Sequence, residues 1–512
     1  MKLLRRKNIN PILAALFLLN LITRSYGIWF QRMAWDEEQF YFGGKGLLRW
    51  SYNLFNGHGF SDISSDLISI YGVAGKYLAA VGLALHELSL SLFGYGAAYD
   101  GFVLMRFFSS LIPSIISVFL LYKLAKRISD SAMFHYAVLF LSAFAFRWVE
   151  TAHYAVPDSL TTMSVIWAIL EWYNFKSRQN ISVILRLSLA IALALAAKIN
   201  VGLLLWGLIS AFSVYSLIKK VYTCRHFFFV QIFTMVLTII LYLPYLFYLD
   251  LYIEEIRFHL FEFPYVIKGH PLIYFIFKPA MGVDWGLLLF ALLALGIVVW
   301  RIKERFRLWS LPIFWLVVFY LYLSLSKGAI ARWEIPLIPV LILFGGYFAY
   351  LIQLKIRQKT LKTLAFSLAL VVMSLRPAYH ILQFDLGLVY EDSVWVELSN
   401  DLKSMDCKEN RFTDFEILMY TLDDFLKSDK QCALIRDHWY NDLYTNEIPG
   451  NYENSGANES FIGRGTLEIR KYIRENWHKV GTFTPKFYTT WTFNPALRYP
   501  ADLYLCSDCI KN

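Results

Sequence analysis

Three adjacent carboxylates, Asp36, Glu37 and Glu38, follow an apolar run in the segment RMAWDEEQFYFGGKG. A carboxylate can accept a proton from a hydroxyl group, and Arg and Lys can hold a phosphate. Ionisable residues of both signs also stand at the ends of other apolar runs. They are Arg106; Glu150, His153 and Asp158; Lys198; Glu254, Glu255, His259, Glu262 and His270; and Arg332 and Glu334. These residue types suit a site that handles a lipid phosphate and a hydroxyl nucleophile together.

The composition places this chemistry in a membrane protein. The chain has 512 residues, of which 57% are hydrophobic and only 17% are charged. Soluble globular proteins have a different balance. The formal charge of +10 comes mostly from short Lys and Arg clusters between apolar runs, which is typical of topology signals. We therefore expect contacts with membrane lipids and no nucleic-acid partner.

Apolar segments long enough to cross a hydrocarbon core of about 30 Å predict about eleven transmembrane helices. They lie near residues 9–30, 102–122, 132–149, 157–173, 183–198, 200–218, 227–247, 284–300, 308–325, 335–352 and 360–376. The first is too long for a signal-peptide core, so we interpret it as a spanning helix. The segment 71–94 is also apolar, but counting it as a span would spoil the alternation of basic loops. We expect it to lie in the outer interface.

Alternate connections between these segments are basic, which predicts that they face the cytoplasm. They are the N-terminus; Lys123, Lys126 and Arg127; Lys176 and Arg178; Lys219, Lys220 and Arg225; Arg301, Lys303, Arg305 and Arg307; and Lys355, Arg357, Lys359 and Lys362. The opposite side receives the first outer loop, 31–101, the outer loop 248–283 and the C-terminal part. The compact loops favour a bacterial inner membrane, with a periplasmic active site.

Two domains are predicted. Residues 1–379 form an all-α polytopic membrane domain, and residues 380–512 form a soluble mixed domain on the non-cytoplasmic side. The long apolar runs stop before residue 380, and the remaining stretch of about 130 residues is large enough for its own core. Within it, VWVELSNDLKSM (394–405) indicates an amphipathic helix. Cys506 and Cys509 form a single CxxC, without a second pair or nearby His to complete a zinc site.

Several motifs follow one another in a characteristic order. They are WDEEQFYFGGKGLL; YGVAGKYLAAVGLALHELSLSLFG, followed by DGFVLMRFF; HYAVPDSLTTM; LALAAKINVGLLL; and ARWEIPLIPVLILFGG. Their order resembles the GT-C superfamily of membrane glycosyltransferases. It is nearest to the family 39 group of protein O-mannosyltransferases and the bacterial lipid A aminoarabinose transferase. The resemblance covers roughly residues 9–376. One departure is that the interfacial helix begins Tyr71-Gly72, with Lys76 a turn later, where the family often has Lys-Pro or Tyr-Pro-Pro.

The resemblance implies an enzyme that takes a sugar from a polyprenyl-phosphate donor and transfers it to an acceptor hydroxyl with inversion. Asp36 matches the family's catalytic Asp and would be the general base, and Glu37 would orient the acceptor or the neighbours of Asp36. We interpret Glu38 as a solvated or structural charge. The substrate-binding candidates are Lys76, Arg106, His153, Asp158, Lys198, His270 and Arg332.

Several alternatives stay open at this point. The acceptor can be a lipid, a glycan or a protein side chain. No cofactor or metal is expected, although carboxylates with a phosphate can hold a divalent ion, here between Asp36 and Asp158. A transporter or flippase of lipid-linked sugars, or a non-catalytic envelope scaffold, would share many of these features. The ionisable residues gather on the outer side and not at the midplane, which favours a surface reaction.

Overall fold

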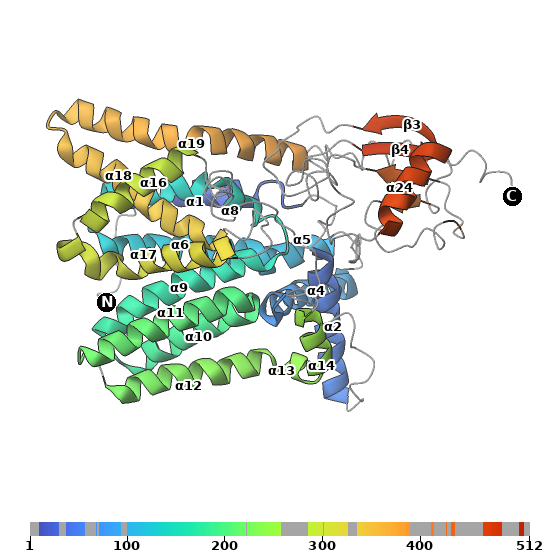
Figure 1. Cartoon of the computed structure of the whole chain (residues 1–512), viewed down its shortest axis with the longest axis horizontal. Helices are drawn as coiled ribbons and strands as arrows, with labels where there is room; N and C mark the ends of the chain where they lie inside the picture. The colour runs from blue at the N-terminus through green and yellow to red at the C-terminus, as the bar shows by residue number, and fades with distance from the viewer. Residues whose placement is uncertain are drawn as a thin grey trace. The chain divides into compact units, whose positions relative to one another are not determined.

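The structure is a computed structural model of the whole chain (Figure 1). It describes residues 10–29, 37–56, 68, 71–93, 100–221, 223–257, 285–300, 302–325, 335–389, 411–413, 426, 432–435, 464–483 and 501–505. The chain divides into two compact units. The first comprises residues 1–255, 275–324 and 331–381, and the second comprises residues 256–274, 325–330 and 382–512. The helix predicted over 394–405 and the Cys506–Cys509 pair lie outside the described residues.

The first unit begins with helices that carry three of the predicted site residues, Glu37, Lys76 and Arg106. They are α1 (Pro11–Ser25), α2 (Glu37–Asn56), α4 (Val73–Phe93), α5 (Asp100–Arg106), the π-helical turn η1 (Phe107–Leu111) and α6 (Ile112–Ile128). The side chain of Asn10 caps α1 by accepting a hydrogen bond from the N–H of Ile12 at 3.0 Å. The π turn ends two residues before Pro113, which has no N–H to donate to a helical ladder.

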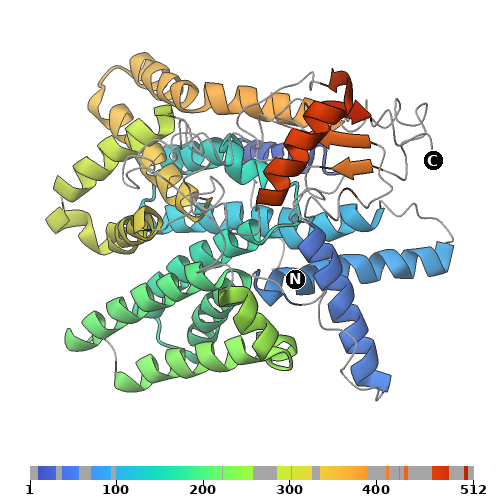
Figure 2. The same cartoon turned by 45° about the vertical axis from the view of Figure 1, so that its right-hand side comes forward.

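A second group of helices follows. It comprises α7 (Ala132–Ala143), α8 (Phe146–Glu150), α9 (Pro157–Ser177), α10 (Ile181–Ala197), α11 (Ile199–Ile218), α12 (Cys224–Leu241), α13 (Leu243–Leu246) and α14 (Leu249–Arg257). Helix α10 packs between α9 and α12, and Figures 1 and 2 show these green helices side by side from two directions. The side chain of Asn180 caps α10, accepting from the N–H of Val183 at 3.0 Å.

The last helices of the first unit are α16 (Trp285–Trp300), α17 (Ile302–Leu325), α18 (Ile338–Lys355) and α19 (Lys359–Val389), and the residues of α19 after Ile381 belong to the second unit. Aromatic side chains hold α17 against α18, since the ring of Trp309 stacks on that of Phe344 with centroids 4.7 Å apart. Helix α16 packs on α18, where a Cβ added at Gly345 would lie 2.4 Å from Leu287. The missing side chain therefore allows the two helices to pack closely.

Five of the described helices are long and apolar enough to cross a membrane. They are Gly101–Ile128, Ile199–Ile218, Cys224–Leu241, Ile335–Lys355 and Lys359–Leu386, with shorter apolar helices at Pro11–Ser25, Ala132–Ala143, Ile181–Ala197, Trp285–Trp300 and Leu308–Leu323. The predicted class, a helical polytopic membrane protein, is confirmed. The count of about eleven spans stays a prediction. The segment predicted over 71–94 is helical as α4, and its place in the interface also stays a prediction.

A buried guanidinium ties α1 to its neighbours. Arg24 is fully buried and donates to the Ser114 hydroxyl, to Oδ1 of Asn20 and to the carbonyl oxygen of Ser142, each at 2.9 Å. It also lies 4.8 Å from the ring centroid of Trp148. A charge at such depth requires polar partners, and these contacts supply them. Arg24 therefore fixes how α1, α6, α7 and α8 pack.

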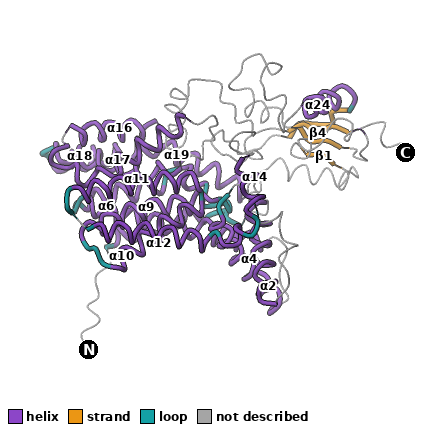
Figure 3. The backbone as a smooth tube through the Cα atoms, turned by 60° about the horizontal axis from the view of Figure 1, so that its bottom comes forward, coloured by secondary structure: helices purple, strands orange, loops and turns teal. Residues whose placement is uncertain are grey.

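The second unit contains a mixed four-stranded sheet in the order β1-β2-β4-β3. Its strands are β1 (Arg411–Thr413), β2 (Cys432–Ile435), β3 (His478–Phe483) and β4 (Ala501–Leu505). Strands β1 and β2 are parallel, and β4 runs antiparallel to both β2 and β3. The helix α24 (Arg464–Asn476) precedes β3, and its Ile469 and Ile473 are buried. Figure 3 shows α24 beside the strands of the sheet. This unit therefore has a core of its own, as expected for a mixed domain.

Candidate active site

Glu37 and Arg106 form the centre of the candidate site. Glu37 is the first residue of α2, and Arg106 is the last residue of α5, directly before the π turn. The Arg106 Nε donates to Oε1 of Glu37 and Nη2 donates to Oε2, both at 2.7 Å. Both side chains are fully buried. Two parallel charge-assisted hydrogen bonds therefore fix both side chains in one geometry.

The same pair also anchors the backbone of two connections. The Glu37 Oε1 accepts the N–H of Ala155 at 2.7 Å, and the Arg106 Nη1 donates to the carbonyl oxygen of Ile28 at 3.3 Å. Just before Ile28, Gly27 has a φ of 81°, a conformation that favours glycine. The pair therefore joins the start of α2 to the turn after α1 and to the connection between α8 and α9.

The connection between α8 and α9 is also held by the π turn. The Ser110 hydroxyl donates to the carbonyl oxygen of Val156 and accepts the N–H of the same residue, each at 3.3 Å. Ser159 at the start of α9 donates to the carbonyl oxygen of Thr151 at 3.1 Å. Single π turns inside helices are frequent at functional sites. Here the π turn places Ser110 against the connection that leads to Asp158.

His153 lies in this connection and is fully buried. Its Nε2 faces the carbonyl oxygen of Tyr26 at 2.7 Å, and its Nδ1 faces that of Val149 at 3.0 Å. Burial, with a smaller contribution from the Arg106 and Arg24 guanidinium groups, lowers the pKa of His153 to about 4. The imidazole is therefore neutral at pH 7, and its contacts link the connection to the turn after α1.

Asp158 and Lys198 form a second ion pair. Pro157 begins α9, which places Asp158 in its first turn, and Lys198 is the extended residue that separates α10 from α11. The Lys198 Nζ donates to Oδ1 of Asp158 at 2.8 Å. The Asp158 side chain is fully buried, whereas that of Lys198 is 12% exposed. Among the described residues, none lies within hydrogen-bonding distance of Oδ2 of Asp158. The buried carboxylate therefore holds a lysine side chain that is itself not fully buried.

Lys76 lies on the first turn of α4 and is fully buried. Its Nζ donates to the Tyr245 hydroxyl at 2.7 Å, and that hydroxyl donates to the carbonyl oxygen of Tyr71 at 3.1 Å. A Cβ added at Gly43 would lie 2.5 Å from Cδ of Lys76. The glycine therefore leaves room for the lysine chain between α2 and α4.

The Lys76 pair and the Lys198 pair lie side by side. The N–H of Gly72 donates to the carbonyl oxygen of Ala197, the residue before Lys198, at 3.2 Å. A Cβ added at Gly72 would lie only 2.0 Å from the carbonyl oxygen of Ala196. Only glycine fits at this backbone contact. The start of α4 is therefore held against the junction of α10 and α11.

A buried apolar cluster connects the Lys76 pair to the Glu37 pair. It consists of Phe40, Tyr71, Ala79, Met105 and Ala155. Phe40 lies one turn after Glu37 in α2, and Met105 directly precedes Arg106. The rings of Phe40 and Tyr71 are in contact, with centroids 5.9 Å apart. All three pairs therefore belong to one connected region at the ends of α2, α4, α5, α9 and α10.

Six of the predicted site residues meet in this region. They are Glu37, Lys76, Arg106, His153, Asp158 and Lys198. Asp36, His270 and Arg332 lie outside the described residues, as does the side chain of Glu38. The parts that all nine predicted residues play in a reaction stay predictions.

The structure adds residues that the sequence interpretation missed. Tyr245 is the acceptor for Lys76, and the backbone N–H of Ala155 is the donor to Glu37. Tyr245 follows Pro244 at the end of an apolar run, which is a weak signal for a helix end. The chain has 33 Tyr residues, so residue type alone could not single it out.

The arrangement is suited to binding an anion. Within the described part of the region, the Arg106, Lys76 and Lys198 cations outnumber the Glu37 and Asp158 carboxylates. Fixed cations stabilise negative charge most strongly where water is excluded. Among the described residues no group of three His, Cys, Asp or Glu side chains could hold a metal ion. Asp36 is not in that set, so an ion between Asp36 and Asp158 stays a prediction.

No family model matches the chain, and no curated protein matches it. The chain is similar to solved structures of ArnT from Cupriavidus metallidurans. The apo form has 13% identity over 74% of this chain and 72% of that one, at a TM-score of 0.47. The form bound to undecaprenyl phosphate has 14% identity over the same shares, at 0.44.

A third similar structure is the Archaeoglobus fulgidus oligosaccharyltransferase in complex with Zn and sulfate. It has 12% identity over 74% of this chain and 53% of that one, at a TM-score of 0.47. The S. cerevisiae protein O-mannosyltransferase complex bound to its sugar donor is also similar, with 17% identity over 51% and 34%, at 0.35. Because every TM-score is below 0.5, the chemistry proposed for this chain rests on its own residues and contacts.

Proposed function

We propose that the chain is a glycosyltransferase that moves a sugar from a polyprenyl-phosphate donor to an acceptor hydroxyl. One observation carries the proposal. The side chain of Lys198, which is 12% exposed and is held by the buried Asp158, lies in the same connected region as the Glu37–Arg106 pair. Asp36, the sequence neighbour of Glu37, supplies a carboxylate. The order of the sequence motifs supports the same class of reaction.

The proposed reaction is a single displacement at the anomeric carbon of the sugar. Asp36 takes the proton of the acceptor hydroxyl, whose oxygen forms a bond to the anomeric carbon. The bond between that carbon and the phosphate oxygen breaks, and polyprenyl phosphate leaves with the bonding electron pair. Attack and departure on opposite faces invert the configuration. The acceptor is a lipid, a glycan or a protein side chain.

Glu37 and Arg106 serve this reaction as positioning residues. Each side chain is fully buried and both carboxylate oxygens of Glu37 are hydrogen-bonded to Arg106. The pair fixes Glu37 at the start of α2. Asp36 is joined to this fixed residue by a planar peptide bond. A general base must lie within hydrogen-bonding reach of its proton, so a fixed chain at this point aids catalysis.

We assign Lys198 to the leaving phosphate, because its side chain is 12% exposed whereas those of Lys76 and Arg106 are fully buried. Lys76 and Arg106 add positive charge from buried positions nearby. From the sequence motifs, Arg332 also neutralises the phosphate, and His270 contributes to substrate binding. The developing negative charge of the leaving group gains most from cations that need no reorientation.

The sidedness of the reaction follows from the basic loops. We propose that the N-terminus is cytoplasmic and that the candidate site and the C-terminal domain face the periplasm of a bacterial inner membrane. The enzyme would then belong with the family 39 transferases. The donor headgroup would reach the site at the membrane surface, which accounts for carboxylates placed directly after an apolar run.

The test is sugar transfer by the purified full chain from labelled polyprenyl-phosphate sugars to extracted envelope acceptors. We expect transfer by the wild type, a product with inverted anomeric configuration by NMR, and strongly reduced transfer by Arg332→Ala. Lys198→Gln should lose about 10²–10³-fold in turnover, with part of the rate regained in Lys198→Arg. A product of retained configuration, or wild-type protein that binds each donor without transferring its sugar, would overturn the proposal.

A further inference from the structure

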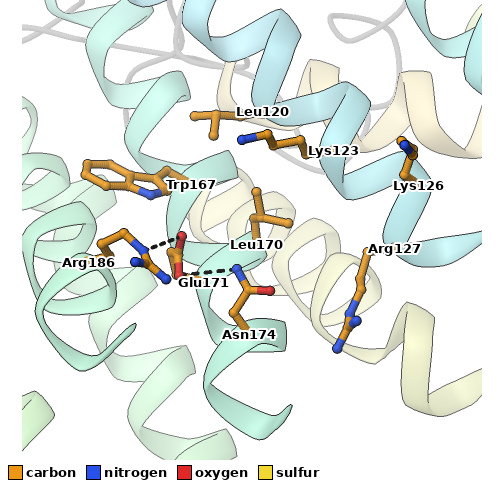
Figure 4. Close-up of a pocket in the computed structure, with 9 residues that line it drawn as sticks. All are labelled: Leu120, Lys123, Lys126, Arg127, Trp167, Leu170, Glu171, Asn174 and Arg186. Atoms are coloured by element: carbon orange, nitrogen blue, oxygen red, sulfur yellow. Dashed lines mark hydrogen bonds and ion pairs between the residues drawn. The ribbon is translucent and has the colours of Figure 1, made fainter. Parts of the chain in front are cut away.

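A second charged pocket lies between α6, α9 and α10, at the other end of α9 from the candidate active site (Figure 4). Its volume is about 610 Å³, which suits a small ligand or headgroup. Glu171 in this pocket lies roughly 20 Å further along the helix than Asp158, at 1.5 Å per residue. The pocket is therefore separate from the site proposed for sugar transfer.

The walls of this pocket carry a surplus of positive charge. Lys123, Lys126 and Arg127 come from the last two turns of α6 and lie on one side of the pocket, and Arg186 and Glu171 lie on the other (Figure 4). The Arg186 Nε donates to Oε1 of Glu171 at 3.0 Å, so that this pair is already neutral. The charge of the three α6 cations therefore remains available to an anion.

The apolar and the charged side chains of the pocket lie at different levels along α6 and α9. On α6, Leu120 precedes Lys123 by one turn, and on α9 Trp167 and Leu170 precede Glu171. The apolar residues therefore lie toward the middle of the helices and the charged residues toward their ends. A phospholipid presents the same order, with its phosphate at the surface and its glycerol and acyl carbons below. A free anion would need no apolar wall.

We propose that this pocket binds the phosphate diester of an anionic glycerophospholipid, on the side of the membrane predicted to be cytoplasmic. Lys123 and Lys126 donate hydrogen bonds to the phosphate oxygens, and Trp167 packs against the glycerol. The Arg186–Glu171 pair forms the opposite wall. Basic pockets between membrane helices are known to suit such headgroups. The inference does not depend on sugar transfer, because it uses none of the residues assigned to that reaction.

Two lysine pairs allow a matched test. Lys123 and Lys126 line the pocket, whereas Lys219 and Lys220, in another connection predicted to be cytoplasmic, do not line it. All four are exposed; Lys123 and Lys126 each lie over an aromatic ring of α6, and Lys219 lies over one of α11. Both lysine pairs therefore experience the same general attraction of cytoplasmic lysines to anionic lipid. The difference between the two double variants isolates the pocket.

The experiment is native mass spectrometry of the full chain in detergent micelles, titrated with cardiolipin, phosphatidylcholine or inorganic phosphate. We expect wild type and Lys219→Gln/Lys220→Gln to bind cardiolipin in preference to phosphatidylcholine. Lys123→Gln/Lys126→Gln should lose about 30-fold in cardiolipin affinity. Lys123→Arg/Lys126→Arg should keep that affinity, which separates lost charge from misfolding. Equal affinities in the two Gln double variants, or displacement of cardiolipin by inorganic phosphate at equal concentration, would overturn the proposal.

Discussion

Arg106 and Glu37 are joined by two hydrogen bonds of 2.7 Å, and neither side chain reaches solvent. The two residues lie on different helices, α5 and α2, and the pair also holds the N–H of Ala155. Removing one partner of such a pair leaves an unbalanced charge in the protein interior. The pair therefore makes the geometry of the candidate site depend on both side chains.

Arg106→Lys should destabilise the first unit strongly, because a lysine cannot form both parallel hydrogen bonds to Glu37. We expect a loss of about 1–3 kcal/mol in the free energy of unfolding, because the charge is kept but a buried hydrogen bond to Glu37 is lost. Arg178→Lys is the matched control, since Arg178 is exposed on the surface and should change stability little. Thermal or denaturant unfolding in detergent measures both. Equal stability of the two variants would contradict the structural role of the pair.

Gly72→Ala should separate α4 from the junction that carries Lys198, because the new Cβ would lie 2.0 Å from the carbonyl oxygen of Ala196. The expected cost is about 1–3 kcal/mol or more. Gly207→Ala on α11 is the control, since nothing lies within 4 Å of a Cβ there. That substitution should stabilise the helix by about 0.5–1 kcal/mol. Unfolding midpoints that shift in the same direction for both variants would refute this account.

Tyr245→Phe should measure the contribution of the Tyr245 hydroxyl to holding Lys76. The substitution keeps the ring but removes the acceptor 2.7 Å from Nζ and the donor to Tyr71. We expect a loss of about 1–3 kcal/mol for a buried group left without this bond. Tyr52→Phe, at a side chain that is 65% exposed, should be neutral. Unfolding of both variants at the wild-type midpoint would contradict a stabilising role for the Tyr245 hydroxyl.

His153 should make stability depend on pH. Its pKa is lowered from the ordinary 6.5 to about 4 in the folded chain. Between these values the unfolded chain binds a proton that the folded chain does not, so stability falls as pH falls from about 6.5 to about 4. The effect is on the order of 3 kcal/mol at its largest. His153→Gln should lose this slope, whereas His226→Gln at the partly exposed start of α12 should keep it.

The sequence predicted which residues gather, but not how they pair. Charged residues at the ends of apolar runs indicated Asp158 and Lys198, and the structure joins them directly. The Glu37–Arg106 pair could not be read from spacing, because it joins helices 69 positions apart in the chain. The long apolar runs predicted helices at 102–122 and 71–94, since the length and composition of a run are local properties of the sequence. A partner across the fold depends on packing, which no single-sequence pattern contains.

Arg24 and the Glu171–Arg186 pair had no sequence signal strong enough to single them out. Arg24 sits near the end of the first apolar run and looks like a residue at a membrane surface, yet it is fully buried among α1, α6 and α7. Glu171 and Arg186 stand apart in the sequence and pair across α9 and α10. In both cases a neighbouring helix supplies polar partners, fully for Arg24 and in part for Arg186, whose side chain is 43% exposed.

The central claim is that Asp36 is the general base of a sugar transfer. The most direct test compares the initial rate of transfer from labelled polyprenyl-phosphate sugar by Asp36→Asn and Glu38→Gln, with donor binding measured for each. We predict that Asp36→Asn binds donor normally and loses about 10²–10⁴-fold in rate, while Glu38→Gln keeps the wild-type rate. Transfer by Asp36→Asn at the wild-type rate would contradict the mechanism.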